Sequence, residues 1–370
     1  MPTERLSAAP AELVVDLGAV VANWRDLRAA HPSGPVGAVL KADGYGLGAR
    51  PIAAALHAAG CRHFFVAILP EAQAIRDAVP GAMLAVLGGP LPGQEDAYLG
   101  AGIVPALGSL GDIALWSAAA RRVGRPLDAL VHIDTGMNRL GLSPAEVQAL
   151  ADDPGLLSGV RIAYAMTHLV SSELPHEPIN ALQRGRFDAL RVKLPSAPTS
   201  LANSSGIFLG PAFGSDLARP GAALYGINPT PGRPNPMRQV ATLRARVLAL
   251  RDVGPGGTVG YNATWRAPER PPGPRRIATV GIGYADGLHR ALSNRGRAFF
   301  DGAPLPLVGR VSMDLTTFDA TGVPGIAIGS QLELLGPNQS PDNLAALAGT
   351  NGYEILTSLR GRLARRHLPA

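Results

Sequence analysis

Lys41 ends an apolar run in the segment AVLKADGYGLGA, residues 38–49, and a glycine-rich turn with Tyr45 follows it. Apolar surroundings disfavour the charged form of a lysine, which lowers its pKa and frees the amine to act as nucleophile or base. Lys41 and Lys193 are the only lysines among 34 basic residues. Because arginine does not give up its proton, Lys41 indicates a role in deprotonation chemistry rather than an ordinary solvated strand end. Lys193, at a helix end, is interpreted as solvated.

Later apolar runs also end in polar residues that suit a binding site. The segments are HIDTGMNRLG, MTHL, LANSSG and ARPGAALYG, and they supply Arg139, His168, Ser204, Arg219 and Gly221. Each has an ordinary structural explanation, such as a helix cap, a buried histidine or an ion pair. Together on one rim they indicate a site, in which Ser204 and the backbone N–H groups at Gly221 would form a phosphate seat opposite the Lys41 amine. A lysine that can form a Schiff base, a phosphate seat and an arginine for a ring nitrogen are what pyridoxal phosphate requires of a protein.

Alternating apolar and Ala-rich stretches between residues 10 and 235 predict repeated strand–helix units that bring these residues to one rim. We expect strands over residues 36–40, 63–68, 83–87, 103–107, 129–133, 160–166, 199–202 and, more weakly, 216–219. The main helices are expected over residues 17–30, 50–59, 110–123, 144–152 and 178–192. Such a pattern favours a (β/α)8 TIM-type barrel, with a doubly wound sheet as the alternative.

The alternation of apolar and Ala-rich stretches ends at the Pro- and Gly-rich segment TPGRPNPMRQ, residues 230–239. Short strands with turn signals follow, among them residues 240–253 and 276–280, and they predict a mostly β second domain. The expected domains are therefore a barrel over residues 12–235 and a β domain over residues 236–370. The N-terminal strand, residues 1–11, is expected to join the β domain.

Composition excludes several classes of protein. The chain has 46% apolar and 17% charged residues, which is typical of a globular fold rather than a disordered one. Its arginines are scattered and its aromatic content is 5%, which argues against a nucleic-acid partner. A single cysteine, Cys61, allows neither an intrachain disulfide nor a thiolate metal cluster, and no metal site is expected. Neither a signal peptide nor a membrane span is recognisable, so we expect a cytoplasmic protein.

Nearly the whole chain resembles the alanine racemase family. The resemblance rests on the segments named above together with VGYNATW, GIGYADGLHR, GRVSMD and GYEIL, in the same order. It implies an N-terminal pyridoxal-phosphate barrel, a C-terminal β domain and a head-to-tail homodimer with shared active sites. It also implies a two-base racemase that interconverts L- and D-alanine, the D-isomer serving as a peptidoglycan precursor.

The resemblance assigns cofactor contacts residue by residue. Lys41 would hold the cofactor covalently and act as one base, Arg219 would face the pyridine nitrogen, and His168 would pack beside the ring. Arg139 would reach the phenolic oxygen side and the substrate. The phosphate contacts would be Tyr45, Ser204, Gly221, Ala222 and Tyr353.

The partner subunit would supply three further residues to each site. Tyr261 would be the second base, while Tyr284 and Met313 would contact the substrate, Met313 at its carboxylate. The residues alone do not choose between Tyr261 and Tyr284 as the base, since both are tyrosines flanked by glycine in the second domain.

Two positions depart from the family pattern. Leu47 replaces the usual histidine after the glycine turn, and His132 stands where many members carry a modified lysine, so Arg139 must be oriented differently here. Three other functions compete with alanine racemisation. They are a racemase of the same fold for serine or several amino acids, a non-enzymatic pyridoxal-phosphate carrier, and a sugar-phosphate aldolase.

Overall fold

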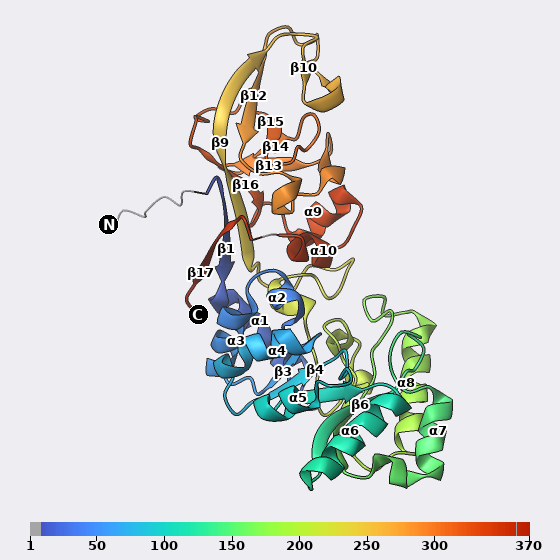
Figure 1. The fold of residues 1–370 in the computed structure, drawn as a ribbon. Helices are drawn as coiled ribbons and strands as arrows, with labels where there is room; N and C mark the ends of the chain where they lie inside the picture. Colours follow the sequence, from blue (N-terminus) through green and yellow to red (C-terminus); the bar gives the residue numbers. More distant parts are fainter. Residues whose placement is uncertain (1–8, 360) are drawn as a thin grey trace.

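The computed structural model describes residues 9–359 and 361–370 and contains a barrel-like layer of strands and helices below a separate β-sheet layer (Figure 1). Most of the expected N-terminal strand over residues 1–11 lies outside the described residues. A strand, β1 (Ala11–Asp16), follows it and belongs to the upper sheet. Within the described residues, no helix is long and apolar enough to cross a membrane.

The lower layer contains seven parallel strands that follow each other in chain order. They are β2 (Ala38–Val39), β3 (His63–Val66), β4 (Met83–Val86), β5 (Val104–Leu107), β6 (Leu127–His132), β7 (Val160–Met166) and β8 (Thr199–Ser200). Side chains of six of these strands and of the later segment that holds Leu217 form one apolar core, which consists of Val39, Phe65, Ala85, Ala106, Leu130, Met166 and Leu217. Inward packing of this kind is the interior of a TIM-type barrel.

The eighth position of the barrel is filled by an irregular segment instead of the strand expected over residues 216–219. Arg219 N donates to Ala202 O at 2.8 Å on one side, and Gly37 N donates to Ala218 O at 2.9 Å on the other. Pro220 has no N–H to donate, which stops a regular ladder. Because hydrogen bonds reach both neighbours, the ring of strands still closes, and the predicted barrel is confirmed.

Helices cover the outside of the barrel. They are α1 (Leu17–Ala30), α3 (Ala49–Ala58), α4 (Leu69–Ile75), α5 (Glu95–Ala101), α6 (Leu110–Val123), α7 (Pro144–Asp152) and α8 (Pro178–Arg191). The short segment α2 (Lys41–Tyr45) lies instead at the carboxyl end of β2, and its backbone is left-handed within residues 42–44. Side-chain caps fix several of their starts: Asp16 accepts from Ala19 N, and Ser109 from Asp112 N. Caps of this type satisfy the free N–H groups of a first turn.

The upper sheet is built around the long strand β9 (Ala241–Val253), which pairs with β1, β12 and β16. The other strands are β12 (Arg275–Val280), β13 (Arg297–Phe300), β14 (Ala303–Pro306), β15 (Thr316–Asp319), β16 (Gln331–Leu335) and β17 (Ala364–Leu368). A separate hairpin, β10 (Thr258–Val259) and β11 (Trp265–Arg266), lies at the end farthest from the barrel in Figure 1. The mostly β architecture is confirmed.

Two helices of the second layer, α9 (Pro341–Ala348) and α10 (Gly352–Thr357), reach back to the barrel. α10 lies against the turn that follows Lys41, where a Cβ added to Gly46 would stand 2.5 Å from Leu356 O. Only glycine permits that approach, and Gly46 also has a positive φ of 80°. The contact brings Tyr353 to the rim of the barrel.

Candidate active site

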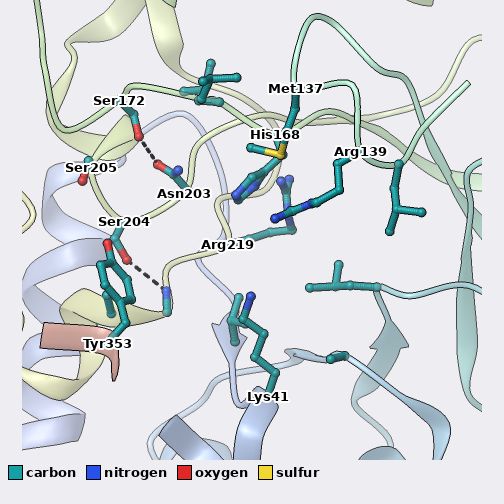
Figure 2. A pocket seen from close by; sticks show the side chains of 18 of the residues that line it. Lys41, Met137, Arg139, His168, Ser172, Asn203, Ser204, Ser205, Arg219 and Tyr353 are labelled. Atoms are coloured by element: carbon teal, nitrogen blue, oxygen red, sulfur yellow. Dashed lines mark hydrogen bonds between the residues drawn. The ribbon is translucent and has the colours of Figure 1, made fainter. Parts of the chain in front are cut away.

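A cavity of about 530 Å³ opens at the carboxyl ends of the barrel strands, a size typical of small-molecule sites (Figure 2). It gathers the predicted residues of the first domain together with Tyr353 from α10. Its predicted lining residues are Lys41, Tyr45, Arg139, His168, Ser204, Arg219, Gly221, Ala222 and Tyr353. Residues from many separate segments therefore meet in one place.

Lys41 stands two residues after the end of β2, and its amine points into the cavity towards Arg219 and Arg139 (Figure 2). Burial lowers the pKa of the Lys41 amine, and the positive charge of Arg139 lowers that pKa further. The carboxylate of Glu71 acts in the opposite direction and raises it. The amine is thus poised to lose its proton more readily than a solvated lysine.

The backbone that follows Lys41 makes an unusual left-handed turn. Residues 42–45 have φ values of 54°, 53°, 62° and 56°. A left-handed conformation costs about 1–2 kcal/mol for each residue other than glycine, and only Gly44 is a glycine here. Local hydrogen bonds hold the turn, since Gly44 N donates to Leu40 O at 2.8 Å and Ala49 N to Asp43 Oδ1 at 2.8 Å. The turn directs Tyr45 back towards the cavity.

A compact polar seat lies on the side of Ser204. Its hydroxyl oxygen accepts hydrogen bonds from Gly221 N at 3.0 Å and Ala223 N at 3.2 Å, which leaves its own hydrogen available to donate. A Cβ added to Gly221 would stand 2.3 Å from the Tyr45 hydroxyl oxygen, so glycine is required. Donors brought this close around a space without side chains suit a phosphate group.

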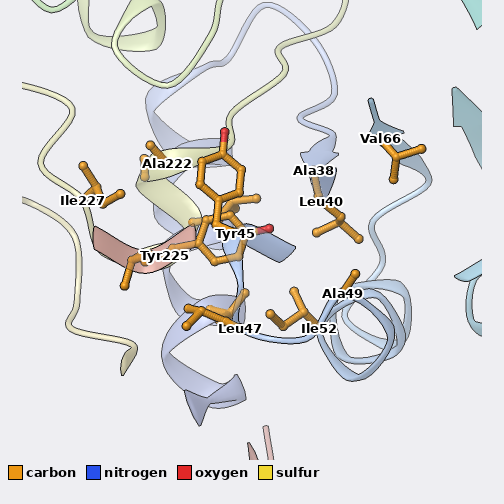
Figure 3. Close-up of a cluster of buried hydrophobic side chains, with 14 of the residues drawn as sticks. Ala38, Leu40, Tyr45, Leu47, Ala49, Ile52, Val66, Ala222, Tyr225 and Ile227 are labelled. Atoms are coloured by element: carbon orange, nitrogen blue, oxygen red, sulfur yellow. The ribbon is translucent and has the colours of Figure 1, made fainter. Parts of the chain in front are cut away.

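Tyr45 forms one wall of that seat and is held firmly. Its ring stacks on Tyr225 with 4.6 Å between centroids and lies 6.3 Å from the ring of Tyr353, within the apolar cluster of Figure 3. Burial raises the pKa of the Tyr45 phenol well above its ordinary value, and the neighbouring Tyr353 adds to this effect. The hydroxyl therefore stays protonated and can donate to an anion.

Arg219 supplies a buried positive charge to the wall of the cavity. Its side chain donates to Ser200 Oγ at 2.5 Å and to Thr167 O at 2.6 Å, which fixes the plane of the guanidinium group. Burial lowers the pKa of Arg219 to about 10, so it remains charged at neutral pH. The cavity consequently favours anionic ligands.

Two histidines complete this part of the wall. Burial, followed by the charge of Arg219, lowers the pKa of His168 to about 3 and that of His132 to about 4. Both imidazoles are neutral at physiological pH, which avoids repulsion with Arg139 and Arg219. His132 is therefore uncharged at the position where the resemblance led us to expect a modified lysine.

Tyr261, Tyr284 and Met313 do not line the cavity of their own chain. They are exposed on the second layer, with 69%, 40% and 54% of their surface accessible, respectively. Tyr284 and Met313 lie on two loops, residues 283–286 and 312–315, which we call the paired loops. Tyr284 N donates to Ser312 O at 3.0 Å and Ala285 N to Met313 O at 3.0 Å. The three residues therefore take no part in the cavity of their own subunit.

The structure also reveals residues at the site that sequence reasoning missed. Ser172 and Asn203 line the cavity and are hydrogen-bonded at 2.8 Å, and Met137 lies beside His168 (Figure 2). Glu71 accepts a hydrogen bond from Ala42 N next to Lys41. A signal for Glu71 was present, because a glutamate near the start of a helix after a strand commonly binds backbone N–H groups.

Comparison with known proteins agrees with this geometry over both parts of the chain. Residues 15–229 match the family model described as "Alanine racemase, N-terminal domain", and residues 240–367 match "Alanine racemase, C-terminal domain". An alanine racemase of Acidiphilium cryptum is 54% identical over 353 residues, which cover 95% of this chain and 97% of the relative. A protein of Mesorhizobium japonicum named "Alanine racemase, catabolic" is 48% identical, over 98% of this chain and 94% of the relative.

Solved structures show the same likeness. The alanine racemase of Bartonella henselae, described with covalently bound pyridoxal phosphate, superposes with a TM-score of 0.93 at 38% identity, covering 97% of this chain and all of that one (100%). The biosynthetic alanine racemase of Pseudomonas aeruginosa gives a TM-score of 0.89 at 32% identity, covering 97% of this chain and 99% of that one.

Proposed function

The chain belongs to the alanine racemase family, and we propose that it interconverts L- and D-alanine with pyridoxal phosphate bound in the cavity at the barrel rim. The observation that carries the proposal is a lysine with a lowered pKa that faces a phosphate seat and two arginines across one cavity. The chain is accordingly an isomerase. The domain limits at residues 12–235 and 236–370, the cytoplasmic location and the supply of D-alanine for peptidoglycan stay predictions.

The residues of the cavity fit this cofactor. The glycine-lined seat of Gly221 and the hydroxyls of Ser204, Tyr45 and Tyr353 would hold the phosphate, with Ala222 at its edge. When bound, pyridoxal phosphate withdraws electrons from the substrate Cα and so makes its proton removable. Lys41 would hold the cofactor from the opposite side of the cavity.

Two further residues orient ring and substrate in this proposal. Arg219 can only donate hydrogen bonds, and its fixed guanidinium would keep a proton away from the ring nitrogen that faces it. His168, which is neutral, would pack beside the ring without adding charge. Arg139 would meet the phenolic oxygen side and the substrate.

Racemisation requires a base that removes a proton from one face of Cα and an acid that delivers a proton to the opposite face. Lys41 would serve one face, and Tyr261 of a second copy would serve the other. Tyr261 is exposed on its own subunit, and it does not line the cavity there. A head-to-tail homodimer would bring the partner's Tyr261, the partner's Tyr284 and the partner's Met313 over the cavity.

A complementation experiment tests both the bases and the shared site. We expect Lys41→Ala and Tyr261→Phe homodimers to be inactive. Random mixing of their subunits makes about half of the dimers hybrids, each with one intact site, so about a quarter of wild-type activity should return. If mixing restores no activity while exchange of subunits is demonstrated, the shared-site proposal is wrong.

Substrate range and cofactor attachment are tested separately. Borohydride treatment followed by peptide mapping should place the reduced cofactor on Lys41. A chiral assay with a panel of amino acids should show alanine well ahead of serine, and comparable turnover of serine would replace the alanine assignment by a broader racemase.

A further inference from the structure

Glu71 of α4 connects two strand ends beside the cavity, which Ala42 and Ala67 line. Its Oε1 accepts from Ala42 N at 2.7 Å, and its Oε2 accepts from Ala67 N at 2.8 Å and Ile68 N at 3.4 Å. Ala42 follows Lys41 directly, whereas Ala67 and Ile68 follow β3. One carboxylate thus ties the turn after the lysine to the neighbouring strand.

The position of this link is significant because Ala42 is the first residue of the left-handed turn. With a φ of 54°, Ala42 adopts a conformation that an alanine avoids, so an outside contact is needed to maintain it. Asp43 and Leu40 hold the later part of the turn. Glu71 holds its beginning, one peptide away from the reactive side chain.

We propose that Glu71 is a positioning residue for Lys41, because its carboxylate clamps the left-handed turn to the end of β3 and so fixes where the Lys41 amine points. The inference rests on the proposed function of Lys41 and goes beyond it. The charge of the carboxylate matters as well. Arg139 and His168 face Lys41 from other strands, and Glu71 is the acidic group that opposes Arg139 at this amine.

Both oxygens of the carboxylate are needed for the clamp. A glutamine at this position has one acceptor oxygen, and its NH2 group would face a backbone N–H on the other side. Glu71→Gln therefore releases either the turn or the strand end and removes the negative charge. Loss of a hydrogen bond to a charged group corresponds to a change of about 10- to 100-fold in an equilibrium constant.

Glu146 provides a matched control. It occupies the corresponding place near the start of α7, where its carboxylate accepts from Ser143 N at 2.8 Å and Leu110 N at 3.4 Å. Glu146→Gln removes the same kind of contact from the same barrel, but away from Lys41. Thermal unfolding of both variants shows whether their general stability is comparable.

The test uses the holoenzyme and two readouts other than turnover. We expect E71Q to bind pyridoxal phosphate about 10- to 100-fold more weakly than the wild type and therefore to lose it on dialysis, whereas E146Q retains it. We also expect the pH midpoint of the visible absorption band to fall in E71Q and to stay unchanged in E146Q, because a negative charge near a protonated nitrogen is lost.

If E71Q matches E146Q in both readouts, the inference is overturned. If E71Q does not fold, Glu71→Asp replaces it. The shorter side chain keeps the charge but is too short to span both strand ends, so it should lose cofactor faster than E146Q, and equal retention would overturn the inference. Failure of the proposed function is distinguishable, because it appears in the wild type as borohydride labelling away from Lys41.

Discussion

Gly221→Ala tests whether the phosphate seat is as rigid as its geometry indicates. The new Cβ would stand 2.3 Å from the Tyr45 hydroxyl oxygen and 3.1 Å from its Cζ. Tyr45 has little freedom to retreat, because its ring is stacked at 4.6 Å on Tyr225, whose hydroxyl donates to Val39 O at 2.9 Å. Either the seat opens or Tyr45 leaves its place.

The close contact sets the size of the effect. Overpacking of a buried contact costs about 1–3 kcal/mol. Gly221 has a φ of −123° and a ψ of −80°, outside the regions that alanine readily adopts, so restriction of the unfolded chain brings no compensating gain. We therefore expect a loss of about 1–3 kcal/mol, which corresponds to about 5- to 150-fold weaker cofactor binding if the strain falls on the seat.

Urea unfolding and cofactor titration measure both quantities, with two variants as controls. Gly185→Ala, in the exposed interior of α8 with no atom within 4 Å of the new Cβ, should stabilise the protein slightly. Tyr45→Phe removes the closest atom, so the double variant with Gly221→Ala should lose less than the sum of the single variants. If Gly221→Ala is as stable and binds cofactor as tightly as wild type, the reasoning that the seat is rigid is refuted.

Three further predictions concern other parts of the molecule. The pKa values of His168 and His132 are lower in the folded protein than in the unfolded chain. The free energy of unfolding should therefore fall as the pH drops from about 6.5 towards 4, by at most about 1.4 kcal/mol per pH unit for each histidine. His132→Asn should flatten the dependence of the urea midpoint on pH. Tyr261→Phe should abolish racemisation in both directions and leave cofactor affinity unchanged, as absorbance titration would show. Arg362 binds Asp286 at 3.0 Å and Asp314 at 2.7 Å, one in each of the paired loops, and Arg362→Gln should raise the KM for alanine by no more than about fivefold without loss of cofactor.

Local chemistry explains how much of the barrel was predictable from the sequence. The helices over residues 17–30, 110–123 and 144–152 have the predicted limits because caps mark their starts, as Ser143 does ahead of Pro144 with Glu146 three positions on. The eighth strand was less predictable. The segment over residues 216–219 bonds to both neighbours, but Pro220 interrupts the ladder that the apolar pattern indicates.

The turn after Lys41 was beyond prediction from the chain's local sequence. Its four left-handed residues include a single glycine, Gly44, and local preference alone favours other conformations for Ala42 and Asp43. Local hydrogen bonds hold the later part of the turn, whereas Ala42 N donates to Glu71, which lies 29 positions away along the chain. A contact between segments distant in sequence therefore meets the turn at the residue next to Lys41, where local sequence carries no signal for it.

The assignment of Tyr261 shows a different limit. Its motif resembles that of a family base, but residue order carries no information on whether a side chain serves its own subunit or another. The structure separates it from the cavity of its chain, since it follows β10 at the far end of the second layer (Figure 1). Its exposure on the surface is compatible with the role proposed for it in the site of a second copy.

The cavity has to meet two opposing electrostatic demands. Arg139 and Arg219 attract the phosphate and the carboxylate that the proposed reaction needs, yet their charges also lower the pKa of nearby bases. The imidazole of His168 remains neutral, so it adds no further repulsion towards Arg139 and Arg219. Lys41 cannot remain neutral throughout, because a base that removes a proton carries it afterwards. A carboxylate beside its turn, supplied by Glu71, offsets Arg139 at that stage, and this explains why an acidic residue stands behind the lysine in a site built to bind anions.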